Sequence, residues 1–178
     1  LGAKHYMQIL SEDRLRKEHD VDVKRLRDDW WEATKFFFSR ALYQGRRDKI
    51  SYEVEKRVRK VLRKYFDDPS QRDRKFDVLK QENWSGVRKD LEKKIGKGKV
   101  GRGRDIELVV DTLRFISRIP DKNIVNYSVQ QIEGGKLKEL WKSLQEINSV
   151  GEKTASFYLR DLVALLGLES KIPCEEQE

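Results

Sequence analysis

The stretch INSVGEKTASFYLRDLV, residues 147–163, decides the fold. It places a short glycine-containing connection between two runs whose apolar residues recur at spacings of three and four, which is typical of amphipathic helices. The first run carries Leu137, Leu140, Trp141, Leu144 and Ile147, and the second carries Ala155, Tyr158, Leu159, Leu162, Val163 and Leu166. Because the connection NSVGE is short, we expect the two helices to be neighbours that pack through these stripes.

Two interpretations of this connection give Lys153 different roles. In the first, Ser149 and Glu152 form a capping box at the start of the second helix, and Lys153 is simply solvated. In the second, the amides and the dipole at the helix start hold a phosphate group. Small residues at Ser149 and Gly151 would then let a nucleic-acid backbone approach, and Lys153 would add a positive charge. Contacts of this kind position a duplex without reading its sequence.

The rest of the chain shows the same helical periodicity and almost no strand signal. Strands would need alternating apolar and polar residues rich in Val, Ile and Thr, whereas here charged residues fill gaps of three and four. We therefore predict an all-α fold. The 178 residues are enough for one core, so a single domain over 1–178 is expected, with room for two small lobes.

Several further helices follow from the apolar pattern. Residues 21–42 predict one long helix at the heart of the core, in which Trp30 and Trp31 are buried rather than stacked on a base. Other helices are predicted over 52–66, around 76–79, over 84–95 and over 106–117. Pro69 marks a turn, and Ile119-Pro120 ends the last of these helices, because proline disfavours helix in the residue before it.

The charge balance favours a polyanionic partner. Lys and Arg number 39 against 31 Asp and Glu, which gives a net charge of +8 and favours nucleic acid or an acidic membrane surface. The segment GKGKVGRGR, residues 96–104, is either a flexible linker or a loop that contacts phosphates. Gln44, Arg46 and Arg47 interrupt the pattern after the first long helix, where the arginines either contact nucleic acid or are solvated.

Other classes of protein and site are not expected. A single cysteine, Cys174, excludes an internal disulfide framework and a cysteine-ligated cluster within these residues, which fits a reducing cytoplasm. No apolar run approaches the ~18 residues that a membrane span needs. His5 and His19 lack partners at metal-ligand spacing, so neither a metal nor another cofactor is expected. We expect a cytoplasmic monomer, associated with the nucleoid if the source is prokaryotic.

The hairpin INSVGEKTASFYL resembles the helix-hairpin-helix of the DNA glycosylase superfamily, the class of endonuclease III and 8-oxoguanine glycosylase. The family hairpin commonly reads Leu-Pro-Gly-Val-Gly-x-Lys-Thr-Ala. The identities are Val150, Gly151, Lys153, Thr154 and Ala155, whereas Ile147, Asn148 and Ser149 stand at the leucine, the proline and the first glycine. GRGRDIELVVDTLRFI resembles the family segment before the hairpin. FFFSRALYQGRRD resembles, more weakly, a helix ending in a Gln-containing turn, so that the resemblance covers roughly residues 30–167.

This resemblance implies a helical fold in which the hairpin grips one strand of double-stranded DNA and a pocket between two lobes receives an extruded base. In bifunctional members, the lysine that matches Lys153 attacks the sugar C1′ and forms a Schiff base. The DNA-contacting residues that it implies, taken with the basic segments above, are Gln44, Arg46, Arg47, Arg102, Arg104, Ser149, Val150, Gly151, Lys153 and Thr154. The expected substrate is a damaged or abasic duplex.

One part of the family pattern is not matched. Family members carry an essential aspartate shortly after the second hairpin helix, where this sequence reads KIPCEEQE and Cys174 or Glu175 falls nearest. We expect that the chain is cut before this acid. Asp161 is a poor substitute, because its position two turns into the helix is typical of a solvated acid.

Three functions are therefore open at the level of sequence. The first is a base-excision repair glycosylase, with or without lyase activity through Lys153. The second is a noncatalytic helix-hairpin-helix module that binds the DNA backbone. The third is a basic helical RNA-binding or scaffold protein, in which the hairpin is only a well-capped helix start.

Overall fold

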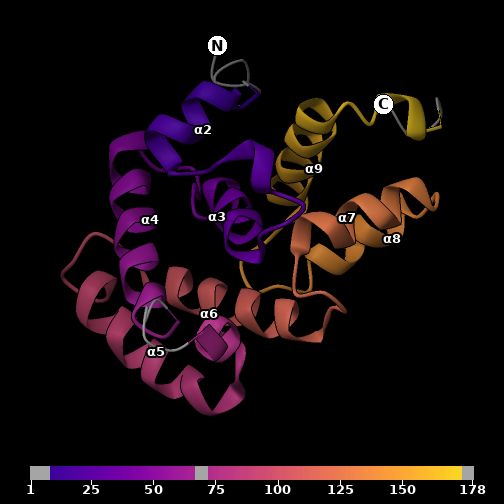
Figure 1. Ribbon diagram of the computed structural model, residues 1–178. Helices are drawn as coiled ribbons and strands as arrows, with labels where there is room; N and C mark the ends of the chain where they lie inside the picture. The colour runs from indigo at the N-terminus through magenta and orange to yellow at the C-terminus, as the bar shows by residue number, and fades with distance from the viewer. Residues whose placement is uncertain (1–8, 67–71, 174–178) are drawn as a thin grey trace.

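The computed structural model describes residues 9–66 and 72–173. Within these two ranges the chain forms α-helices and short 3-10 helices and contains no strand (Figure 1). The predicted all-α class is therefore confirmed for the described part of the chain. Some residues named in the sequence analysis lie outside the described ranges. They are Pro69 at the predicted turn, His5, which was considered as a metal ligand, and Cys174 and Glu175, which fall nearest to the position of the family aspartate.

The central helix is α3 (Trp30–Ala41), which packs against helices on every side (Figure 1). On one side lie α4 (Asp48–Arg63), α5 (Gln81–Ile95) and α6 (Gly103–Arg118). On the other lie α7 (Ile124–Glu133), α8 (Leu137–Leu144) and α9 (Glu152–Leu166), and both α7 and α9 contact α3. The remaining elements are α2 (Glu12–His19) and the 3-10 helices η1 (Val23–Arg25), η2 (Arg72–Leu79) and η3 (Glu169–Lys171).

One continuous core joins the two sides of the molecule. Phe36 and Phe37 of α3 are fully buried, and the ring of Tyr158 from α9 meets Phe37 edge-on at 5.1 Å between centroids. The Tyr158 hydroxyl lies 3.0 Å from the Ser128 hydroxyl of α7, which satisfies a polar group inside the core. Burial raises the pKa of Tyr158 far above its usual value, so this hydroxyl stays protonated. The hairpin of α8 and α9 is thus fixed to the centre of the fold.

The long helix predicted over 21–42 is wrong in its first third. The chain forms only the 3-10 turn η1 there, and α3 begins at Trp30. Asp29 is the cause, because its carboxylate accepts the amides of Trp31 at 2.8 Å and Glu32 at 3.3 Å and so caps a new helix. Trp30 and Trp31 are buried, as expected.

The other predicted helices hold with shifted ends. The helix predicted over 52–66 begins four residues earlier as α4, and the segment around 76–79 is the 3-10 helix η2. The helix α6 ends before Ile119-Pro120, as predicted. The helix α7 was not predicted; it starts where the Asn123 side chain accepts the amide of Asn126 at 2.9 Å.

Candidate nucleic-acid interface

The predicted hairpin is present as α8 and α9, joined by residues 145–151. Leu140 and Leu144 of α8 and Ala155 of α9 are fully buried, as their stripes predicted. The indole Nε1 of Trp141 donates to the Ser156 hydroxyl at 3.0 Å and so ties the two helices together near the turn. The sequence therefore determines this supersecondary unit through local periodicity.

The predicted capping box is wrong. The N-cap of α9 is Gly151, which makes no side-chain cap hydrogen bond. The Ser149 hydroxyl donates instead to the Asn148 side-chain oxygen at 3.0 Å. The reason is that Ser149 adopts a left-handed backbone conformation with φ of 66°, which places the helix start two residues later than a serine cap requires. The residue at the N-cap of α9 therefore contributes no side-chain cap.

Two positions of the turn carry small residues for different reasons. Ser149 has a positive φ, a backbone conformation that favours glycine. Gly151 has an ordinary φ of −92°, and a Cβ built on it would meet no atom within 4 Å. The fold thus does not require a glycine at 151. The missing side chain leaves open space at the N-cap of α9.

The turn borders a hollow of about 480 Å³, which also contains residues from two distant elements. Gln44 follows α3, and its amide Nε2 donates to the Ser149 carbonyl at 3.2 Å. Arg104 belongs to the first turn of α6, and its guanidinium donates to the Gln44 carbonyl at 3.5 Å. Asp111 of α6 accepts the amide of Asn148 at 2.8 Å and holds the turn in place. Glu146 is the acid of this lining.

The structure thus brings together half of the residues that the sequence singled out. Gln44, Arg104, Ser149, Val150 and Gly151 line the hollow. The Val150 side chain is buried, so that residue presents only its backbone. The remaining surface candidates are not part of the lining. Arg47 precedes α4, Arg102 precedes α6, and Lys153 and Thr154 belong to the first turn of α9.

Arg46 is not a surface residue, and the expectation that it contacts nucleic acid is withdrawn. Its guanidinium forms a bidentate pair with the fully buried Asp105, at 2.6 and 2.8 Å, and donates to the Leu42 carbonyl at 2.8 Å. Asp105 also accepts the amide of Arg102 at 2.7 Å. Arg46 therefore fixes the start of α6, which carries Arg102 and Arg104, and acts on the site only through them.

Lys153 is exposed and shares an aromatic ring with two other cations. Its Nζ lies 5.7 Å from the Phe157 ring centroid, and the guanidinium carbons of Arg40 and Arg160 lie at 5.7 and 5.0 Å. Cations at these distances are attracted by the face of the ring. Three positive charges therefore gather at one place on α9 and the end of α3.

Asp161 lies behind this cluster, and its interpretation as a solvated acid is wrong. It is fully buried, pairs with Arg40 and accepts from Arg160 at 3.1 Å. Asp161 thus orients both arginines. The sequence missed Phe157 and Arg160, although they lie four and seven residues after Lys153 and so share its helix face. No pattern in the sequence around Arg40 indicates that its side chain belongs to this cluster.

The described residues hold no group of three or more His, Cys, Asp or Glu side chains that could bind a metal ion. In the same part of the chain no helix is both long and apolar enough to cross a membrane. Compared with known protein families, curated proteins and solved structures, the chain shows no significant match. The functional argument therefore rests on the site itself.

Proposed function

We propose that this chain is a DNA-binding protein of the helix-hairpin-helix DNA glycosylase type, whose hairpin binds the phosphate backbone of a duplex. The observation that carries the proposal is the glycine at the N-cap of α9, which makes no side-chain cap and leaves open space around its position. Amides at a helix start and the helix dipole favour an anion there. The open space at Gly151 admits a sugar-phosphate backbone, and Arg104 supplies a nearby charge.

In this proposal Gln44 acts beside the opened duplex. It lies in a left-handed turn with φ of 50° and bonds to the hairpin carbonyl of Ser149. A residue held next to the phosphate-binding turn is well placed to enter the stack while the hairpin grips the strand. Enzymes that act on a base need such an extrusion, because the reacting bond is not accessible inside the duplex.

Lys153 supplies the chemistry in a bifunctional enzyme of this type. Its amine attacks the sugar C1′ and the N–C1′ bond forms, while the base leaves with the electron pair of the glycosidic bond and takes up the proton that the amine loses. On an abasic site the same amine condenses with the C1′ aldehyde and releases water. The exposed position of Lys153 in the first turn of α9, two residues after Gly151, supports this role. The cations around Phe157 add attraction for the phosphates that flank the sugar.

Binding of a fluorescent duplex by two variants tests the proposal. Gly151→Asp places a negative charge in the open space, whereas Ser85→Asp makes the same charge change on the exposed surface of α5. We expect Gly151→Asp to weaken binding about tenfold or more, which corresponds to about 1.4 kcal/mol, and Ser85→Asp to bind like the parent. Equal affinities of the two variants would reject the hairpin interface. Tighter binding of a structured RNA than of the duplex would favour an RNA-binding protein instead.

A further inference from the structure

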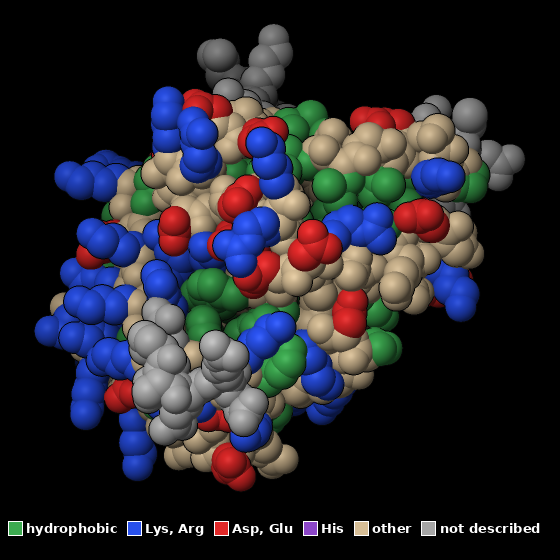
Figure 2. All heavy atoms as spheres, viewed as in Figure 1, with side chains coloured by type: hydrophobic (Ala, Val, Ile, Leu, Met, Phe, Trp, Pro, Cys, Tyr) green, Lys and Arg blue, Asp and Glu red, His purple; other side chains and the backbone are tan. Residues whose placement is uncertain are grey.

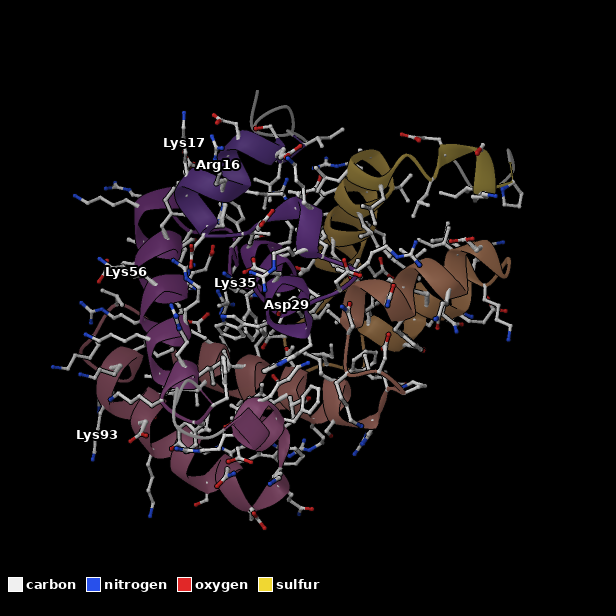
Figure 3. The ribbon with its side chains drawn as sticks, viewed as in Figure 1. Arg16, Lys17, Asp29, Lys35, Lys56 and Lys93 are labelled. Atoms are coloured by element: carbon white, nitrogen blue, oxygen red, sulfur yellow. The ribbon has the colours of Figure 1, made fainter. Side chains whose placement is uncertain are left out.

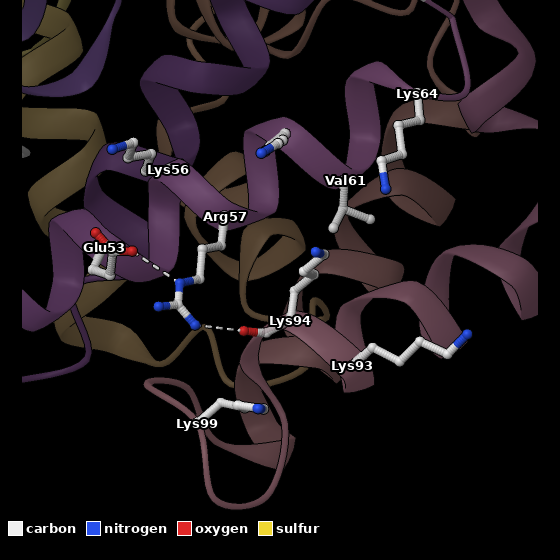
Figure 4. Close-up of a pocket in the computed structure, with 9 residues that line it drawn as sticks. Glu53, Lys56, Arg57, Val61, Lys64, Lys93, Lys94 and Lys99 are labelled. Atoms are coloured by element: carbon white, nitrogen blue, oxygen red, sulfur yellow. Dashed lines mark hydrogen bonds and ion pairs between the residues drawn. The ribbon is translucent and has the colours of Figure 1, made fainter.

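A second concave surface lies between α4 and α5 (Figure 4), and these helices lie across the molecule from the hairpin elements α8 and α9 (Figure 1). It is a groove of about 390 Å³, and its lining contains seven cations and one acid. The lysines of this groove are Lys56, Lys60, Lys64, Lys93, Lys94 and Lys99. Figure 2 shows Lys and Arg side chains gathered over this edge of the molecule, and in Figure 3 Lys56 and Lys93 point outward from it. We call this surface the α4–α5 groove.

Among the described residues, the single acid of the lining offsets only a small part of the groove's positive charge. Glu53 is the acid of the lining, and its carboxylate is held by Arg57 at 2.9 Å. The hydrogen bond from Arg57 lowers the pKa of Glu53. Within the described part of the chain, none of the six lysines forms an ion pair. With a net charge of +8 for the whole protein, this groove holds much of the excess.

One carbonyl at the end of α5 is already occupied by a cation of the groove. Carbonyl groups at a helix C-terminus carry partial negative charge, and α5 ends at the groove. The guanidinium of Arg57 donates to the Lys94 carbonyl at 2.9 Å and occupies this position. The ammonium groups therefore face solvent, where their mutual repulsion favours binding of an anion.

The shape and chemistry of the groove fit an extended polyanion. Lys56 and Lys60 of α4 and Lys64 at its C-cap are spaced by four residues, so they cover roughly 12 Å along the helix axis. Lysines are flexible point charges that neutralise phosphates without fixing their orientation. The apolar member of the lining, Val61, is buried, so the groove offers no side chain that would insert among lipid tails. A row of phosphodiesters matches these features better than a membrane surface.

The groove is connected to the hairpin hollow through one loop. Lys99 lines the groove and Arg104 lines the hollow. Four residues separate Lys99 from Arg104, and these five Cα–Cα steps limit their Cα separation to roughly 18 Å. One nucleic acid can therefore reach both surfaces within about one turn of a duplex, which is roughly 34 Å.

We infer that the α4–α5 groove is a second binding site for nucleic-acid phosphates, which extends the contact of the chain beyond the hairpin. The inference rests on the proposed function in one respect, which is that the polyanion bound in the groove is a nucleic acid. The groove lysines supply affinity that depends strongly on salt and not on sequence or lesion, because they release counterions when they neutralise phosphates.

Two triple variants with the same net charge test this inference. Lys56→Gln/Lys60→Gln/Lys94→Gln removes three charges from the groove, and Lys24→Gln/Lys136→Gln/Lys171→Gln removes three exposed lysines elsewhere. The probe is an undamaged 20-base-pair duplex, titrated over a range of NaCl concentrations. We expect the plot of log affinity against log salt to become shallower by about 2 to 3 for the groove triple, since each phosphate contact contributes about 0.9. The control triple keeps the slope of the parent.

Coincident salt slopes for the two triples would overturn the inference. It would also be overturned if the groove triple lost binding to phosphatidylserine vesicles while its DNA curve matched the control. The same titration with Gly151→Asp separates the two proposals. A normal affinity for Gly151→Asp together with a shallow slope for the groove triple removes the hairpin proposal and keeps the groove. Loss of binding by Gly151→Asp, together with unchanged salt slopes for both triple variants, removes the groove inference and keeps the hairpin proposal.

Discussion

Gln44 and Ser149, 105 residues apart, both have left-handed backbones and meet in a hydrogen bond of 3.2 Å from the Gln44 amide Nε2 to the Ser149 carbonyl. This contact joins the turn after α3 to the turn of the hairpin. Left-handed conformations are costly for residues with a side chain and tend to persist where the surrounding structure determines them. The two turns therefore hold each other in the geometry that opens the hollow.

The backbone of Ser149 gives the first prediction. A β-branched residue is poorly accommodated at a φ of 66°. We expect Ser149→Val to lower the free energy of unfolding by about 1 to 2 kcal/mol, whereas Ser149→Gly leaves it unchanged or raises it by less than about 1 kcal/mol. Urea unfolding of both variants measures this. Equal stability of the valine and glycine variants would show that the left-handed conformation is not maintained.

The buried pair of Arg46 and Asp105 gives the second prediction. Removing the guanidinium leaves a carboxylate that is fully buried. We expect Arg46→Met to lower the free energy of unfolding by about 3 to 5 kcal/mol. Arg88→Met is the matched control, because the Arg88–Glu107 pair is nearly half exposed and such pairs contribute about 1 kcal/mol or less. A loss of similar size in both variants would refute the structural role of Arg46.

Glu55 gives a prediction on pH dependence. It is buried against His19, whose Nδ1 lies 2.7 Å from Glu55 Oε2, while Oε1 has no partner among the described residues. Burial raises the pKa of Glu55 above its ordinary value of 4.5, despite the opposing hydrogen bond with His19. The folded state then holds a proton that the unfolded chain releases. The stability contributed by Glu55 is therefore full below pH 4.5 and declines as the pH rises through the folded-state pKa.

Unfolding of the parent and of Glu55→Gln between pH 4 and pH 7 tests this sign. We expect the parent to lose stability relative to Glu55→Gln as the pH rises. Glu53→Gln is the control with the opposite sign, because the hydrogen bond from Arg57 lowers the pKa of Glu53. A parent that gains stability relative to Glu55→Gln with rising pH would contradict the assignment.

The spacing of apolar residues and the positions of proline predicted those helices whose limits depend on short segments of the sequence. The stripes of α8 and α9 and the stop at Ile119-Pro120 are properties of short segments, and the structure has them. The start of α3 was predicted incorrectly because the helical spacing of apolar residues continues on both sides of Asp29. The Asp29 carboxylate accepts the amide of Trp31 and so starts a new helix at this point. The Ser149 cap was predicted incorrectly because a left-handed residue cannot be recognised from the letters around it.

Long-range pairing accounts for most of what the sequence did not show at the site. Arg40 and Asp161 are 121 residues apart, and Arg46 and Asp105 are 59 residues apart. The sequence around each of these four residues does not show whether its charge is buried or solvated. That becomes clear only when both partners of a pair are placed in the structure. The four-residue spacing of lysines on α4 is visible in the sequence, but its pairing with the end of α5 is not.

Borohydride trapping on a duplex with one abasic site tests the central claim, that this hairpin grips DNA and presents Lys153 to the sugar. The parent is compared with Lys153→Ala, with Lys153→Arg, which keeps the charge but cannot form the same imine, and with Lys142→Ala on the exposed face of α8. We predict a covalent adduct for the parent and for Lys142→Ala, no adduct for either Lys153 variant, and retained duplex binding by Lys153→Arg. An adduct that survives in Lys153→Ala, or a parent that binds the abasic duplex without forming one, would contradict the role of Lys153 as the nucleophile.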